Sequence, residues 1–229
     1  MNAQSVAAVQ MADVKVNRFV AQVYLLMTLG LLITGVTSTA VASNAAFLLK
    51  LATSPWLAFG LFIIQIAIVG FLAGAVMRMK AGVAFVLFIL YAGLTGVTLS
   101  TLFLYYGQAN ISSVFWMTAG TFFLASLVGL ITKKDMSSAG MVLVMLLLGW
   151  SFMWFMSWFF PYSNFNWAMN FVGIALFVGL AAWDSNRIKN IGAQVGDHPA
   201  KGGLVVIGAL ALYLDFINLF LLMLRASRR

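Results

Sequence analysis

The stretch ALALYLDFINLFLLMLR, residues 209–225, decides the fold, because it is an apolar run with a carboxylate, Asp215, near its middle. A run of about 20 apolar residues is long enough to cross the ~30 Å hydrocarbon core of a membrane as a helix. An ionised side chain at the centre of such a helix costs roughly 2.5–3.5 kcal/mol on insertion scales, so it is rarely kept without a partner or a task. The stretch predicts a membrane helix and raises the question of what Asp215 meets.

The composition of the whole chain indicates the same class of protein. Hydrophobic residues make up 63% of the 229 residues and charged residues 8%, against roughly 45–50% and 25% in soluble domains. We predict an all-α polytopic membrane protein with seven transmembrane helices, made of a cytoplasmic segment 1–18, a membrane domain 19–225 and a short basic tail 226–229. The expected apolar runs are 19–42, 56–77, 82–105, 112–132, 138–160, 165–184 and 203–225.

The positive residues lie between these runs, where they face lipid headgroups and fix the orientation, so their excess does not indicate nucleic-acid binding. With a cytoplasmic N-terminus, the outer segments through the sixth helix hold only Lys50, which favours that orientation. Seven crossings place Arg225, Arg228 and Arg229 outside; the alternative is a last helix that re-enters and returns. The Lys and Arg residues predicted on the cytoplasmic side are Lys15, Arg18, Arg78, Lys80, Lys133, Lys134, Arg187, Lys189 and Lys201.

Acidic residues are few, and there is no cysteine to form a disulfide or a thiolate metal site. The aspartates are Asp13, Asp135, Asp184, Asp197 and Asp215. We expect the first, second and fourth to be solvated in polar segments. Asp184 closes the sixth apolar run, where it is either a helix-end carboxylate near Arg187 and Lys189 or part of a site. Asp215 lies ~18 Å along its helix from Gly203, close to the middle of the membrane.

Small residues suggest where helices approach one another. Gly70 and Gly74 form a G-x-x-x-G step in the second apolar run, and such steps let helix backbones pack closely in membranes. We therefore predict helix packing at these two glycines.

Several segments resemble the Bax inhibitor family, also called transmembrane Bax inhibitor motif proteins, in its bacterial branch. They are TKKDMSSAG at 132–140, AAWDSNRIKN at 181–190, YAGLTGVTLSTLF at 91–103, SSVFWMTAGTFF at 112–123 and ALALYLDFINLFLLMLR at 209–225. The resemblance covers about residues 20–225, and its most specific part is LYLDFINLFL. One departure is that Ser185 and Asn186 follow Asp184, where the family usually has D-T-Q.

The resemblance implies a fold in which the C-terminal helix is central and wrapped by the other six, in a bacterial inner membrane. It implies a calcium leak set by pH through the pair Asp184 and Asp215, with transient calcium binding by these carboxylates. It also implies that Arg78 holds the closed state as a latch partner, although Arg78 could equally be an anchor whose side chain snorkels to the interface.

Elementary electrostatics gives a reason for such a pair. Two carboxyl groups in a poorly solvated interior cannot both ionise cheaply, so they are expected to share a proton in a short hydrogen bond between two helices. The bond is a latch, and the same oxygens are hard ligands suited to calcium. The latch and the ion site can thus be one structure.

Three function classes follow from this pattern. The leading hypothesis is a pH-sensitive cation leak channel with calcium as the ion, no cofactor, and lipid and cations as partners. The second is a non-conducting regulator that binds other membrane proteins, such as a protease or a stress-response partner, and the third is a proton-coupled transporter. We expect no enzyme, because the single histidine, His198, has no Glu or Cys partner and no catalytic motif is present.

Overall fold

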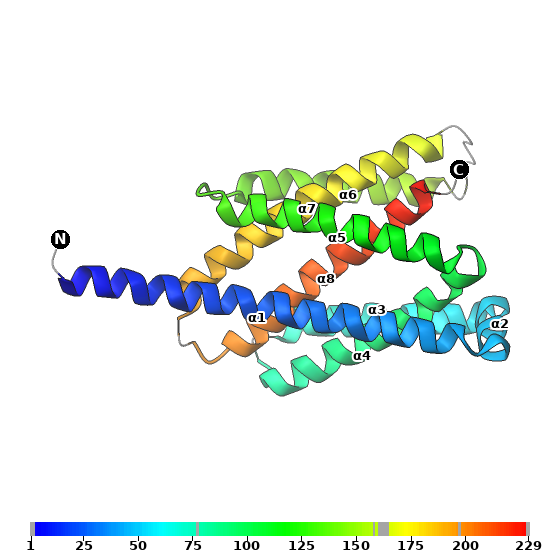
Figure 1. The fold of residues 1–229 in the computed structure, drawn as a ribbon, viewed down its shortest axis with the longest axis horizontal. Coiled ribbons are helices and arrows are strands. Elements are labelled where there is room, and N and C mark those ends of the chain that lie inside the picture. Colours follow the sequence, from blue (N-terminus) through cyan, green and yellow to red (C-terminus); the bar gives the residue numbers. More distant parts are fainter. Residues whose placement is uncertain (1–2, 77, 158, 160–164, 197, 228–229) are drawn as a thin grey trace. The chain divides into compact units, whose positions relative to one another are not determined.

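The described chain is helical throughout, as expected for an all-α membrane protein. The computed structural model describes residues 3–76, 78–157, 159, 165–196 and 198–227, and this part contains no strand. Figure 1 labels the helices along the chain. They are α1 Ala3–Ala42, α2 Ala45–Thr53, α3 Pro55–Ala75, α4 Ala81–Leu99, the 3-10 helix η1 Ser100–Leu104, α5 Gln108–Ile131, α6 Ser137–Met156, α7 Phe165–Val195 and α8 Lys201–Ala226.

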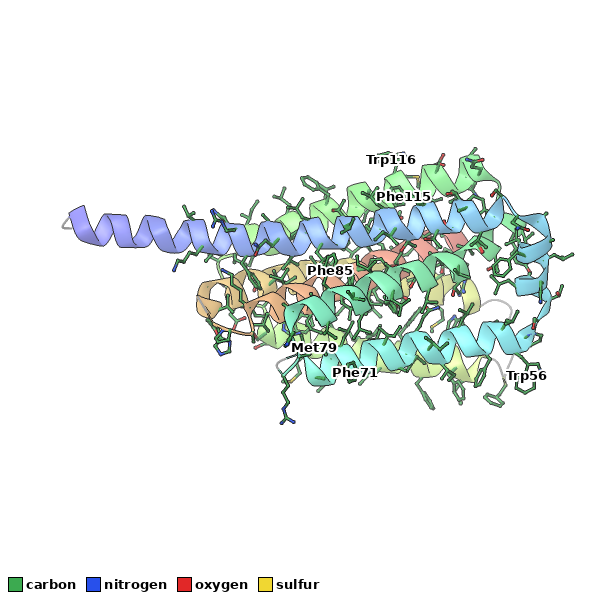
Figure 2. The ribbon with its side chains drawn as sticks, turned by 90° about the horizontal axis from the view of Figure 1, so that it is seen from below. Trp56, Phe71, Met79, Phe85, Phe115 and Trp116 are labelled. Atoms are coloured by element: carbon green, nitrogen blue, oxygen red, sulfur yellow. The ribbon has the colours of Figure 1, made fainter. Side chains whose placement is uncertain are left out.

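Seven of these segments are long and apolar enough to cross a membrane, which confirms the predicted number of transmembrane helices. Large apolar side chains cover their outer surfaces. Figure 2 shows Trp56 and Phe71 pointing outward from α3, and Trp56 is 84% exposed. In a soluble protein such a surface would drive aggregation. In a bilayer it contacts lipid.

The helices differ most from the predicted apolar runs at three places. Helix α1 begins at Ala3, so the polar N-terminal segment continues the first transmembrane helix. The short helix α2 was not predicted; Asn44 caps it by accepting a hydrogen bond from the Phe47 N–H at 3.1 Å. Helix α7 runs on to Val195, so the loop predicted over 185–202 is helical for most of its length.

Helix α7 ends where a glycine allows it to end. Gly196 has φ +46°, a left-handed conformation that glycine adopts without steric cost and that commonly terminates helices. The loop to α8 is therefore short, and His198 is part of it, accepting a hydrogen bond at Nδ1 from the Ala200 N–H at 3.1 Å. Asp197 lies outside the described residues, as do Arg228 and Arg229.

The chain divides into two compact units. Unit 1 comprises Met1–Gln108 with Gly192–Tyr213, and unit 2 comprises Ala109–Ile191 with Leu214–Arg229. Helix α8 therefore contributes its first half to unit 1 and its second half to unit 2. The central position of α8, wrapped by the other six helices, stays a prediction. Because α8 is one unbroken helix from Lys201 to Ala226, it does not re-enter and return.

In unit 1, α4 packs against α1 and α3 (Figure 1), and a chain of buried hydroxyl groups joins it to α8. The Thr34 hydroxyl of α1 lies 2.7 Å from the Tyr213 hydroxyl of α8 and 2.9 Å from the Ala92 carbonyl oxygen of α4. If Tyr213 donates to Thr34 and Thr34 donates to Ala92, both protons are used. Such interhelical hydrogen bonds stabilise helix association in membranes by about 0.6–2 kcal/mol each.

Unit 2 is built from α5, α6, α7 and the end of α8. Phe115 and Phe122 of α5 each pack edge-on against Phe216 of α8, with ring centroids 5.5 Å apart. The Trp150 Nε1–H of α6 donates to the Met169 carbonyl of α7 at 2.8 Å. The aromatic contacts hold α8 against α5, and the tryptophan hydrogen bond holds α7 against α6.

Glycine allows close helix approach, but at positions other than the predicted pair. A Cβ at Gly70 or Gly74 would meet nothing within 4 Å, so no contact among the described residues supports a packing role for them. At Gly96 of α4 a Cβ would lie 2.7 Å from the Thr34 carbonyl oxygen of α1. At Gly129 of α5 it would collide with the Ala182 carbonyl oxygen of α7. Both are close approaches to a backbone oxygen of another helix, and Gly203 of α8 makes a third approach of this kind, since a Cβ there would lie 2.8 Å from the Val76 carbonyl oxygen.

Candidate carboxylate site

The two aspartates singled out from the sequence meet in unit 2. Asp184 lies ~16 Å along α7 from its last residue, Val195, and Asp215 lies ~21 Å along α8 from its first residue, Lys201. Because a short loop joins the two helices, the carboxyl groups lie at similar depths. The hypothesis that Asp184 is a helix-end carboxylate is wrong, since the polar sequence after it continues as helix.

Both carboxyl groups are buried and interact directly. Asp184 is 9% exposed and Asp215 is 6% exposed, and each side chain is a hydrogen-bonding partner of the other. Such a bond needs a proton, which one carboxyl group donates to the other. Oδ2 of Asp215 is fully buried, and among the described residues no backbone N–H, amide or hydroxyl group donates to it. The pair is therefore close in space and incompletely satisfied.

One positive charge bears on the pair from within unit 2. The Arg187 guanidinium interacts electrostatically with the Asp184 carboxyl group, one turn away on α7. It also lies over the Trp183 ring, with Cζ 5.5 Å from the ring centroid, in a cation–π contact. Arg187 is exposed. Arg187 therefore attracts the Asp184 carboxyl group from an exposed position and is not a buried partner of it.

Arg78, the predicted latch partner, lies in unit 1 in the turn after α3, and its side chain is exposed. Its backbone N–H donates to the Ala75 carbonyl at 2.9 Å. The aspartates belong to unit 2, so the latch role of Arg78 stays a prediction.

Asn186, two residues after Asp184, ties α7 to the end of α5. Its Nδ2 donates to the carbonyl oxygens of Gly129 at 3.0 Å and Thr132 at 3.1 Å, and its Oδ1 accepts from the Met136 N–H at 3.2 Å. The last carbonyls of a helix have no partner within the helix. Asn186 supplies one, and it fixes the turn between α5 and α6 on α7.

Lys189 reinforces this cap. Its Nζ donates to the carbonyl oxygens of Leu130, at 2.9 Å, and of Thr132. A cation at a helix C-terminus also interacts favourably with the helix dipole. The positive charge of Lys189 is thus bonded to backbone carbonyl oxygens at the end of α5. These bonds help to explain how α7 can continue as a helix past Asp184.

No motif in the sequence predicts this cap. In the sequence, Ser185 and Asn186 are a departure from D-T-Q, and Lys189 is a cytoplasmic charge near Asp184. The bonds of Asn186 join residues 50–57 positions apart in the chain. No local pattern predicts such a pairing; only the packing of α5 against α7 brings these groups together.

We expect replacement of Asn186 by leucine to destabilise the protein by about 1–3 kcal/mol, because several backbone groups of α5 and the following turn lose their partner while buried. Thermal unfolding in detergent measures the loss. Asn190→Ala is the matched control, since Asn190 makes one long bond, 3.3 Å from its Nδ2 to Asn186 Oδ1. Equal effects of the two changes would contradict a capping role for Asn186.

The pair does not by itself make a resident metal site. Within the described part of the chain, no group of three or more His, Cys, Asp or Glu side chains could hold a metal ion. Calcium takes 6–8 oxygen ligands, so two carboxyl groups supply only part of a coordination shell. Asp135 does not contribute, because it binds the N–H and hydroxyl of Ser137 at 3.1 and 2.7 Å.

Comparison with known proteins agrees with the resemblance seen in the sequence. The family described as "Inhibitor of apoptosis-promoting Bax1" matches residues 16–227. Inner membrane protein YbhL of Escherichia coli (strain K12) is 41% identical over 209 residues, covering 90% of this chain and 89% of the relative. An uncharacterized protein of Borreliella burgdorferi is 36% identical over 210 residues, covering 91% and 90%. An uncharacterized membrane protein of Streptococcus pyogenes serotype M3 is 31% identical over 224 residues, covering 95% of each. With a match over nearly its whole length and these relatives, the chain belongs to the Bax inhibitor family.

Proposed function

We propose that this membrane protein is a pH-sensitive cation leak channel, with calcium as the ion and the Asp184–Asp215 pair as the gate. The observation that carries the proposal is the direct interaction of two buried carboxyl groups on neighbouring transmembrane helices. Two like charges 4 Å apart repel by about 4 kcal/mol at an effective dielectric constant of 20. A shared proton removes this repulsion and joins α7 to α8; loss of the proton restores the repulsion and separates them.

The chemistry of the pair suits a hard cation that passes through. Carboxylate oxygens are the preferred ligands of calcium. Because the pair provides too few oxygens for a complete shell, a cation there would keep part of its water and leave readily. The proposal therefore involves transient binding, no resident metal, no cofactor and no chemical step.

We further propose that the N-terminus is cytoplasmic and that the protein resides in a bacterial inner membrane. Two findings support this: the excess of Lys and Arg in alternate loops, and the printed name of the E. coli relative, an inner membrane protein. Seven crossings then place the C-terminus on the opposite side. A reporter fused at Lys133 that proves accessible only from outside would overturn this orientation.

Calcium entry into liposomes containing only this protein tests the function. We expect entry that changes steeply with pH near neutrality, because protonation of the pair closes the latch. Protein-free liposomes and liposomes with the double variant Asp184→Asn/Asp215→Asn are the controls. No entry at any pH would favour a non-conducting regulator instead. Entry of a solute coupled to a fixed number of protons would favour a transporter.

A further inference from the structure

Ser126 of α5 carries a buried hydroxyl group that does not bond to its own helix. Serine and threonine within helices commonly donate to the carbonyl four residues earlier, and Thr118 and Thr121 of α5 do so at 2.8 and 2.9 Å. The Ser126 side chain is 3% exposed, and within the described part of the chain its Oγ has no hydrogen-bond partner. Buried hydroxyl groups are nearly always paired, so an unpaired one needs an explanation, such as a bound water molecule or a functional role.

The turn of α5 before Ser126 contacts α8 beside Asp215. Phe122, one turn earlier on the same buried face of α5, packs against Phe216 with ring centroids 5.5 Å apart. Phe216 directly follows Asp215 in the chain. Side chains four residues apart lie on one face of a helix, so Ser126 faces the same side as Phe122.

The turn of α5 after Ser126 contacts α7 beside Asp184. A Cβ at Gly129, one turn later on the same face, would lie 3.0 Å from Cβ of Ser185. Ser185 directly follows Asp184 in the chain. Ser126 is thus flanked, one turn to either side, by contacts with the immediate neighbours of both aspartates.

We infer that Ser126 is the third member of the carboxylate site, where its hydroxyl group meets the Asp215 carboxyl group through one bridging water molecule and holds it in place. Oδ2 of Asp215 lacks a donor, and the Ser126 hydroxyl lacks an acceptor. A hydroxyl can donate to a charged carboxylate and accept from a protonated one. Ser126 is therefore a positioning residue that can serve both states of the gate.

Few charges compete with this interaction. Among the described residues of unit 2, Arg187 is the charged group that acts on the Asp184–Asp215 pair from outside it. Helices α5 and α6 have no ionisable side chain. Arg225 lies near the end of α8, with Cζ 5.5 Å from the Trp154 ring centroid.

A double-mutant cycle of Ser126→Ala and Asp215→Leu on Tm tests the contact without requiring transport. We expect the two changes to be non-additive, because the second removes nothing further once the first has broken the interaction. The control cycle pairs Asp215→Leu with Ser113→Ala, an exposed serine of α5 that donates to the Ala109 carbonyl at 2.8 Å, and should be additive. Additive changes in the Ser126 cycle would overturn the inference.

The role of Ser126 in gating rests on the proposed function, and the pH profile of calcium entry tests it. Loss of a donor makes the charged carboxylate costlier, so Ser126→Ala should move the pH midpoint of entry upward by roughly one to two units. Ser113→Ala should leave it in place. If the unaltered protein shows no calcium entry, the proposed function is wrong, and the Tm cycle still tests the interaction between Ser126 and Asp215. If the Tm cycle is non-additive but Ser126→Ala leaves the pH midpoint of entry unchanged, Ser126 has a role in packing only, and its part in gating is wrong.

Discussion

Asp184→Asn and Asp215→Asn are each expected to abolish the steep pH dependence of calcium entry near neutrality, and the double variant is expected to add little to either. Each single change removes the like-charge coupling that makes the pair hold a proton, while keeping a side chain of similar shape that can form hydrogen bonds. The two carboxyl groups act as one element, since they interact directly. Changes within such an element are strongly non-additive.

The size of the coupling can be bounded. Interacting residues typically couple by 0.5–3 kcal/mol. Asp135→Asn is the matched control, because that carboxylate binds Ser137 at the start of α6 and not the pair. It should leave the pH profile unchanged.

Independent behaviour of the two aspartates would contradict a shared proton. If Asp184 only balances the nearby Arg187, Asp184→Asn leaves the profile intact while Asp215→Asn alters it, and the two effects add. A carboxyl separation above ~3.5 Å at every pH in an experimental structure would also exclude a direct bond. A bridging water or ion would then carry the coupling.

Composition and hydropathy were sufficient to predict the class of fold and the number of crossings, because lipid imposes one strong requirement on every span. They were not sufficient to place the end of α7. The apolar run stops at Asp184, and the residues beyond it are polar, yet the helix continues to Val195. Hydropathy measures how readily a segment enters lipid, whereas the length of a helix also depends on hydrogen-bond partners inside the protein. Asn186 and Lys189 find such partners at the end of α5.

The same limit applies to the candidate site. Asp215 could be recognised from one stretch of sequence because a carboxylate in the middle of a span is costly wherever it lies. Ser126 could not, since a serine in an apolar helix is common and its missing partner appears only in three dimensions. Glycine spacing was misleading for a related reason. Spacing predicts which residues share a face, but not whether that face meets another helix.

Gly129→Ala is expected to have the largest effect on stability of any small substitution in α5. A Cβ there would collide with the Ala182 carbonyl oxygen of α7, a backbone atom that cannot rotate away as a side chain can. Overpacking of this kind typically costs 1–3 kcal/mol and occasionally more. The change would also push α5 from α7 at the level where Asn186 caps the Gly129 carbonyl.

Gly120→Ala provides the matched control in the same helix. A Cβ at Gly120 would meet nothing within 4 Å, and alanine is favoured over glycine within a helix by about 0.5–1 kcal/mol. The two substitutions should therefore shift Tm in opposite directions, with Gly129→Ala lowering it and Gly120→Ala leaving it level or raising it. If Gly129→Ala were tolerated equally well, α5 and α7 would not be in backbone contact in the membrane. The placement of Ser126 beside the carboxylate pair would then lose one of its two supports.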